Sequence, residues 1–287
     1  MTLDSISPAV AQWELTSRLR YRRAQLRMPA TVVAARIGRT RNYWSIVESD
    51  KRVLSEAHLR TVMDLFELDP AEQAELLTLR EAAKRRSPFA AHSALLSPEV
   101  VRMFGMERGA ATIRAYDPGL ISGLLQIPEY TQAVLGASVF VRDVDIEEYL
   151  EVWRLRQKPL LSGDLGMLRV IIGQAALQQT VAGPRVHRAQ LEHLLAMMDR
   201  SNVEVLVLPY VATGRGLLGA STMYLFDFPT AHLPTLGWYE MAASAAFITD
   251  GDVKDLSVMY EQAVGEVGDV DSVALIEAEL RRLMLVA

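Results

Sequence analysis

Five polar side chains close together in the sequence have the chemistry needed to recognise DNA bases. They are Arg39, Thr40, Arg41, Asn42 and Ser45. An arginine can donate two hydrogen bonds to guanine O6 and N7, and an asparagine can pair in the same bidentate way with adenine N6 and N7, each worth about 1–3 kcal/mol of discrimination. We therefore expect this short stretch to face the major groove of a DNA duplex.

Two short helices that meet at a tight turn would position these side chains. The spacing predicts one helix from about Ala30 to Ile37, a turn at Gly38-Arg39 and a second helix from about Arg41 to Glu48. Thr40 is suited to cap the second helix, because its hydroxyl can accept a hydrogen bond from a first-turn amide. The polar residues fall on one side of the pair, and the opposite side is apolar, with Val33, Ile37, Trp44 and Val47.

This pattern resembles the XRE-type, or lambda-repressor-like, helix-turn-helix. The resemblance rests on Ala34, the Ile37-Gly38 turn, Trp44, Val47 and Glu48. It implies a first-helix arginine paired with the recognition-helix glutamate, here Arg23 with Glu48. It also implies Thr40, Arg41 and Asn42 nearest the bases, Tyr43 and Ser45 beside them, and Lys51 and Arg52 near a phosphate.

Two positions depart from the family pattern. Ala30 stands where the family has a glutamine that touches phosphate, and Asp50 stands where a glycine is expected after the recognition helix. Both changes remove a feature that would help DNA binding. They leave a second interpretation open, in which the helical domain serves as a protein-docking module.

Charge is distributed unevenly along the 287 residues, which are enough for two domains. Residues 1–52 hold ten Lys and Arg against four Asp and Glu, a net charge of +6, so the total of −5 leaves −11 for the remainder. A basic head on an acidic body is typical of a DNA-binding domain joined to a domain that does not bind DNA. No apolar run reaches the length of a membrane span and no secretory leader is evident, so we expect a cytoplasmic, nucleoid-associated protein with no membrane contact.

Further helices complete the first domain, which we place at residues 1–86. Ser7-Pro8 is a helix start with serine as the cap, and Ser55 and Asp69 are expected to cap two later helices. Four arginines of the first helix are expected outside, where they would flank phosphate: Arg18, Arg20, Arg22 and Arg23. Residues 87–98 break the helical periodicity and are predicted to be a linker.

A second signature lies at Tyr116–Leu135 in the larger domain, residues 99–287. It resembles the PGLLQTPEYA segment of an actinobacterial regulator family in which an XRE-type domain precedes a domain of unknown function. An arginine-rich helix typically follows there, and Glu147–Leu161 fits. The resemblance implies a transcriptional regulator, and some members are antitoxin-like proteins that act with a small partner protein encoded nearby.

The remainder of the larger domain alternates between extended and helical patterns. Strands are predicted at Met167–Ile172, Val203–Leu208, Ser221–Phe228 and Leu236–Met241. One helix is predicted to open at Ser97-Pro98 and run towards Ala115, and others are predicted at Val186–Met198, Val253–Val264 and Asp271–Leu285. The predicted fold is therefore mainly α with a small α+β part: an N-terminal lambda-repressor-like helical bundle and a C-terminal α+β domain around a small antiparallel sheet.

Several motifs resemble catalytic or cofactor sites without meeting their requirements. Residues 214–219 spell GxGxxG, but a strand and not a helix follows, so we predict a loop and no nucleotide. His187 and His193 are about 240° apart on a helix and cannot share a metal. Glu147, Glu148 and Glu151 are better explained by intrahelical ion pairs. With no cysteine either, we predict no cofactor, no metal, no catalytic residue and no enzyme activity.

These patterns together predict a DNA-binding transcriptional regulator that acts on double-stranded DNA as a homodimer. Its larger domain would sense a protein partner or a small ligand. The alternative is an antitoxin-like subunit that binds a small partner protein, with DNA binding secondary.

Overall fold

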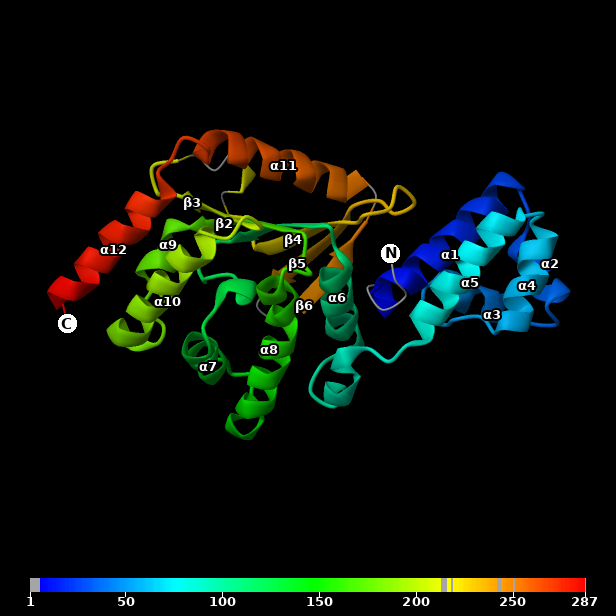
Figure 1. Ribbon diagram of the computed structural model, residues 1–287, viewed down its shortest axis with the longest axis horizontal. Helices are drawn as coiled ribbons and strands as arrows, with labels where there is room; N and C mark the ends of the chain where they lie inside the picture. The colour runs from blue at the N-terminus through cyan, green and yellow to red at the C-terminus, as the bar shows by residue number, and fades with distance from the viewer. Residues whose placement is uncertain (1–5, 213–215, 218, 242–243, 250, 287) are drawn as a thin grey trace. The chain divides into compact units, whose positions relative to one another are not determined.

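The computed structural model describes residues 6–212, 216–217, 219–241, 244–249 and 251–286 (Figure 1). The chain forms two compact units. The first comprises Met1–Ala90, Phe104–Gly109 and Thr230–Pro234, and the second comprises Ala91–Met103, Ala110–Pro229 and Thr235–Ala287. The sequence led us to expect two consecutive domains, whereas these units combine stretches that are distant in the sequence.

Five helices account for most of the first unit: α1 (Pro8–Gln25), α2 (Ala30–Arg36), α3 (Arg41–Glu48), α4 (Glu56–Leu65) and α5 (Pro70–Lys84). Side-chain caps define three of the starts. Thr40 accepts a hydrogen bond from the Tyr43 amide, Ser55 from that of His58, and Asp69 from two first-turn amides of α5. These caps agree with the sequence prediction, because capping depends on residues only two or three positions apart.

The core of this unit is formed by the apolar sides of all five helices. Leu15 and Leu19 of α1, Val33 of α2, Trp44 of α3 and Phe66 after α4 are all buried. Burial of large side chains is the main stabilising contribution in a bundle of this size. The buried Trp44 fixes which side of α3 faces the core.

Ser7 differs from its prediction. It occupies the cap position of α1, but its hydroxyl makes no capping bond and instead donates to the carbonyl of Gly105, 2.5 Å away. Gly105 lies in helix α6 (Pro98–Gly109). The hydroxyl thus prefers a partner from a segment that local sequence reasoning could not place. The segment predicted as a linker is also partly structured, since a 3-10 helix, Pro88–His92, buries Phe89.

The second unit is built on a six-stranded sheet with the order β3-β2-β1-β4-β5-β6. Its strands are β1 (Thr112–Asp117), β2 (Met167–Gly173), β3 (Val203–Leu208), β4 (Thr222–Asp227), β5 (Leu236–Met241) and β6 (Ser244–Ile248). Strands β1, β2 and β3 are parallel, and β4, β5 and β6 extend the sheet in antiparallel pairs.

Helices cover both faces of this sheet (Figure 1). They are α7 (Pro128–Gly136), α8 (Ile146–Ser162), α9 (Gln174–Gln178), α10 (Gly183–Met198), α11 (Gly251–Val267) and α12 (Ser272–Val286). Helix α11 lies on one face, where Tyr260 and Ala263 pack with Ile171 and Leu225 of the sheet. The helices that connect the parallel strands lie on the other face.

The predicted fold class is confirmed, but the predicted size and strand directions of the sheet were wrong. The sheet is mixed and six-stranded, not small and antiparallel. The end of the helix predicted to run towards Ala115 is instead strand β1, and its Arg114 pairs with Asp227 and Glu261. Strand β6 was not predicted. The GxGxxG string at 214–219 lies partly outside the described residues.

Candidate nucleic-acid interface

The turn between α2 and α3 depends on the backbone freedom of glycine. Gly38 has a φ of +65°, a left-handed conformation that other residues adopt at a cost. Thr40 is extended, and its hydroxyl accepts a hydrogen bond from the Tyr43 amide at 3.2 Å. The turn and the cap together set where α3 begins, and so which side chains occupy its first turn.

The predicted contact residues lie on the solvent side of this arrangement. Trp44 and Val47 are buried on one side of α3. Seven of the predicted residues are exposed, and Tyr43 is half-buried; the exposed ones are Arg39, Thr40, Arg41, Asn42, Ser45, Lys51 and Arg52. In a helix-turn-helix, the side chains that reach base edges lie in the first turn of the recognition helix, on the side away from its buried apolar residues.

Two of these arginines share one aromatic ring. The guanidinium carbon of Arg39 lies 5.3 Å from the centroid of the Tyr43 ring, and that of Arg52 lies 5.0 Å from the same centroid. His58 of α4 contacts the ring edge-on, with 6.1 Å between centroids and 88° between ring planes. Sequence reasoning placed Tyr43 beside the bases but did not place it between the two cations.

An ion pair joins α1 to α3. Arg23 Nε lies 2.6 Å from Glu48 Oε1, Arg23 Nη2 lies 3.0 Å from Glu48 Oε2, and Arg23 Nη1 donates to the Met28 carbonyl at 2.9 Å. The side chains are 22% and 14% exposed. This is the pair that the family resemblance implied. It holds the end of α3 against α1.

The other arginines of α1 were expected to flank phosphate, and for two of them the structure shows a different role. Arg18 forms ion pairs with Glu14, Glu72 and Glu75. Arg22 donates twice to the carbonyl of Phe66. Arg18 and Arg22 therefore bind to partners within the helical unit. Local sequence could not show this, because most of the partners lie about 45 to 60 residues away.

Asp50, which the resemblance treated only as a departure from glycine, has a structural role. Its φ is +59°, so it adopts the conformation for which the family uses glycine. The Thr16 hydroxyl donates to its carboxylate, and the Gln12 side-chain amide donates to its carbonyl at 2.5 Å. These bonds anchor the exit of α3 to α1. The Thr16 bond requires the carboxylate of Asp50, whereas the Gln12 bond to the backbone carbonyl would also be open to a glycine.

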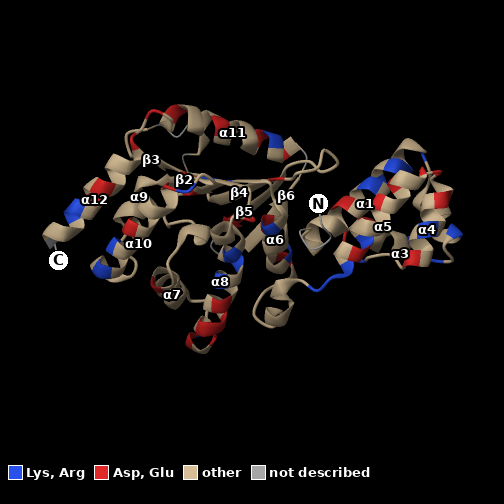
Figure 2. Ribbon diagram, in the orientation of Figure 1, with Lys and Arg blue, Asp and Glu red and all other residues tan. Residues whose placement is uncertain are grey.

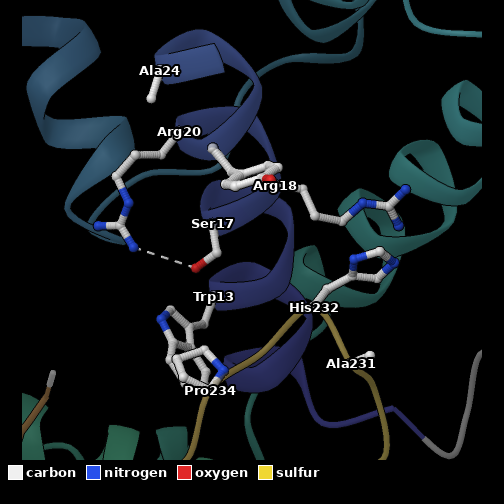
Figure 3. A pocket seen from close by; sticks show the side chains of 9 residues that line it. Trp13, Ser17, Arg18, Arg20, Ala24, Ala231, His232 and Pro234 are labelled. Carbon is white, nitrogen blue, oxygen red and sulfur yellow. Dashed lines mark hydrogen bonds between the residues drawn. The ribbon is translucent and has the colours of Figure 1, made fainter.

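A cavity of about 560 Å³ lies along the outer side of α1, within the first unit (Figure 3). Aromatic and basic side chains form about half of its lining, which comprises Trp13, Ser17, Arg18, Arg20, Tyr21, Ala24, Ala231, His232 and Pro234. Arg20 donates to the Ser17 hydroxyl at 3.5 Å, while Arg18 is held by its carboxylates. Arg18 and Arg20, which were expected to flank phosphate, are in this lining, whereas the predicted contact residues of α3 and its two flanks are not.

A buried carboxyl in the second unit also escaped sequence reasoning. Asp117 ends β1 and is 5% exposed. Burial raises the pKa of its carboxyl from about 3.8 to about 7, against the lowering effects of Ser122, Thr222 and Arg156. Its place in a turn-like Asp-Pro-Gly string gave no sign of burial. A correct prediction of strand β1 for the preceding residues would have indicated that Asp117 lies at the end of a buried strand.

An apolar loop projects from the second unit between α7 and α8. Val139 is 90% exposed, Phe140 73% and Val144 83%. The loop is ordered internally, since the Phe140 amide donates to the Ser138 hydroxyl and Arg142 forms an ion pair with Asp145 at 2.6 Å. The first turns of α8 beside it are acidic (Figure 2). Three large apolar side chains are therefore exposed within six residues of this one loop.

Comparison with known families gives a match for each part of the chain. A domain of unknown function, DUF5753, matches residues 100–278, and a helix-turn-helix domain matches residues 14–76. The chain therefore belongs to the DUF5753 family and carries a helix-turn-helix domain at its N-terminal side. No curated protein and no solved structure matches it. Among the described residues, no helix combines the length and apolar character needed to span a bilayer.

Proposed function

We propose that this member of the DUF5753 family is a sequence-specific transcriptional regulator of the XRE type that inserts the first turn of α3 into the major groove. The helix-turn-helix domain indicates a DNA-binding regulator. The observation that carries the finer proposal is the exposure of Arg41 and Asn42 on a helix whose opposite side is held by the buried Trp44. In this assignment Arg41 reads guanine, Asn42 reads adenine, and Lys51 contacts phosphate.

Binding as a homodimer is part of this proposal. One helix-turn-helix covers about half of an operator, and two copies on half-sites about 34–36 Å apart supply useful affinity. The basic first 52 residues support DNA approach, and the acidic remainder supports a separate role for the second unit. The protein would act in the cytoplasm at the nucleoid, as in the actinobacterial regulators it resembles. No catalytic step belongs to this function.

The second unit is proposed to receive a protein partner or a ligand that controls DNA binding. The exposed loop with Val139 and Phe140 supports a protein partner. The antitoxin-like alternative rests on the same loop and on Ala30, which lacks the phosphate-binding side chain of the family. In that alternative the partner complex is the main function and DNA binding is secondary.

Salt dependence separates the two functions. The full chain is titrated onto a labelled 30-base-pair duplex of random sequence at several salt concentrations. A regulator that neutralises phosphates shows an affinity that falls steeply, with a log–log slope of about −0.9 for each phosphate contacted. A flat titration, or no binding at low salt, contradicts the proposal and favours the antitoxin-like alternative. Arg18→Gln removes one positive charge as a control and should leave the slope unchanged, because Arg18 pairs with carboxylates of the helical unit.

A further inference from the structure

We infer that Tyr43 is a positioning residue: its ring holds Arg39 and Arg52 together so that both guanidinium groups meet adjacent phosphates of one DNA strand. This inference rests on the proposed DNA-binding function and goes beyond it. It gives Tyr43 a role through the two arginines, where the sequence alone pointed to a direct contact beside the bases.

The geometry brings together two cations from opposite ends of α3. Arg39 precedes the helix and Arg52 follows it. Both guanidinium carbons lie within 5.3 Å of one ring centroid, so the distance between them is less than twice that length. Phosphates of one strand follow each other with a rise of about 3.4 Å along the duplex axis. Two cations no farther apart than this can both reach phosphates of the same strand.

The Tyr43 ring attracts both arginines and so offsets the repulsion between them. Both side chains are solvent-exposed, and their like charges repel. A cation over the face of a tyrosine is attracted to the ring, and this attraction offsets the repulsion and restricts the rotamers that each arginine samples. Fewer rotamers are then lost when the DNA arrives, which favours binding.

The ring itself is fixed by its surroundings. Tyr43 is half-buried and packs against the hydrophobic core of the first unit. His58 contacts its edge, and the Tyr43 amide is bonded to the Thr40 hydroxyl. The phenol hydroxyl has no part in either cation contact. Phenylalanine at this position should therefore perform the same function.

A double-mutant cycle on the full chain tests the inference with a random-sequence 30-base-pair duplex, because phosphate contacts are independent of sequence. In the wild-type protein, Arg39→Ala is expected to weaken binding about tenfold, as for a charged hydrogen bond. In the Tyr43→Leu background the same change should cost only about twofold. Tyr43→Leu alone should weaken binding about tenfold and make the salt slope shallower by about one to two.

Three comparisons complete the test. Tyr43→Phe should bind like wild type, and Tyr21→Leu, the same change at an exposed tyrosine of α1, should have no effect. Thermal unfolding shows that each variant is folded, and Tyr43→Met replaces the leucine variant if the latter does not fold. Equal costs of Arg39→Ala in both backgrounds, or a loss with Tyr43→Phe, overturn the inference while leaving the regulator proposal intact. Absence of duplex binding by the wild-type chain overturns both.

Discussion

Removal of the Arg23 side-chain charge should destabilise the helical unit by an amount set by the geometry of its ion pair. Arg23→Met keeps most of the aliphatic stem but leaves Glu48 with no cation and the Met28 carbonyl without its donor. Breaking a fully buried pair from one side costs about 3–5 kcal/mol. The exposures of 22% and 14% allow some solvation of the remaining carboxylate, so we expect a loss of about 2 kcal/mol.

Scanning calorimetry of the full chain measures this loss through the transition of the first unit. For a unit of this size, about 2 kcal/mol corresponds to a decrease in Tm of about 8–16 °C. The matched control is Arg20→Met, because Arg20 is exposed on the same helix and forms only a long hydrogen bond, to Ser17, among the described residues. That control should change the free energy of unfolding by less than about 0.5 kcal/mol.

A cycle with Glu48→Gln isolates the pairwise contribution. The two single variants and the double variant should be coupled by more than about 0.5 kcal/mol, since both side chains belong to one interaction. Additive losses, or an Arg23→Met variant as stable as wild type, would refute the argument that this pair fixes α3 against α1.

Two further changes give separate predictions. Gly38→Ala should lower the free energy of unfolding, measured in urea, by about 1–2 kcal/mol. The φ of +65° disfavours a side chain there, although a Cβ would meet nothing within 4 Å. Ser45→Ala serves as the neutral comparison, and a Gly38→Ala variant as stable as wild type would argue against this turn. Asp117 keeps its proton in the folded state up to about pH 7 but loses it near pH 3.8 when unfolded. The second unit should therefore lose stability as pH rises from about 4 to 7, and Asp117→Asn should flatten that dependence; a slope unchanged by the substitution would count against a buried neutral carboxyl.

Much of the first unit was predictable because its signals are local. The caps at Thr40, Ser55 and Asp69 and the apolar spacing through Val33, Trp44 and Val47 depend on residues within one or two helical turns. Helix boundaries followed closely from them. The exposure of the predicted contact residues also follows, since a helix with a buried tryptophan on one side presents the other side to solvent.

Contacts between distant residues were not predictable in the same way. The charge of Arg18 looks free in the sequence, yet Glu72 and Glu75 neutralise it. The Arg39–Tyr43–Arg52 cluster depends on how the chain returns after α3. Single-sequence patterns carry periodicity but no information on which remote side chains meet.

The sheet was underestimated for a related reason. Strand β1 is central, with β2 parallel on one side and β4 antiparallel on the other. Its Arg114 appears polar in the sequence, but Asp227 from β4 and Glu261 from α11 pair with it. A central strand with one paired arginine lacks the uninterrupted apolar run that marks buried strands.

Selection of bound sequences from a pool of randomised duplexes, with the full chain at physiological salt, tests most directly whether α3 reads DNA. We predict that the wild-type protein enriches a defined motif containing a guanine position. Arg41→Ala should keep the rest of that motif and lose the preference at this one position. Enrichment of no motif by the wild-type chain, or an identical motif from Arg41→Ala, would contradict the account.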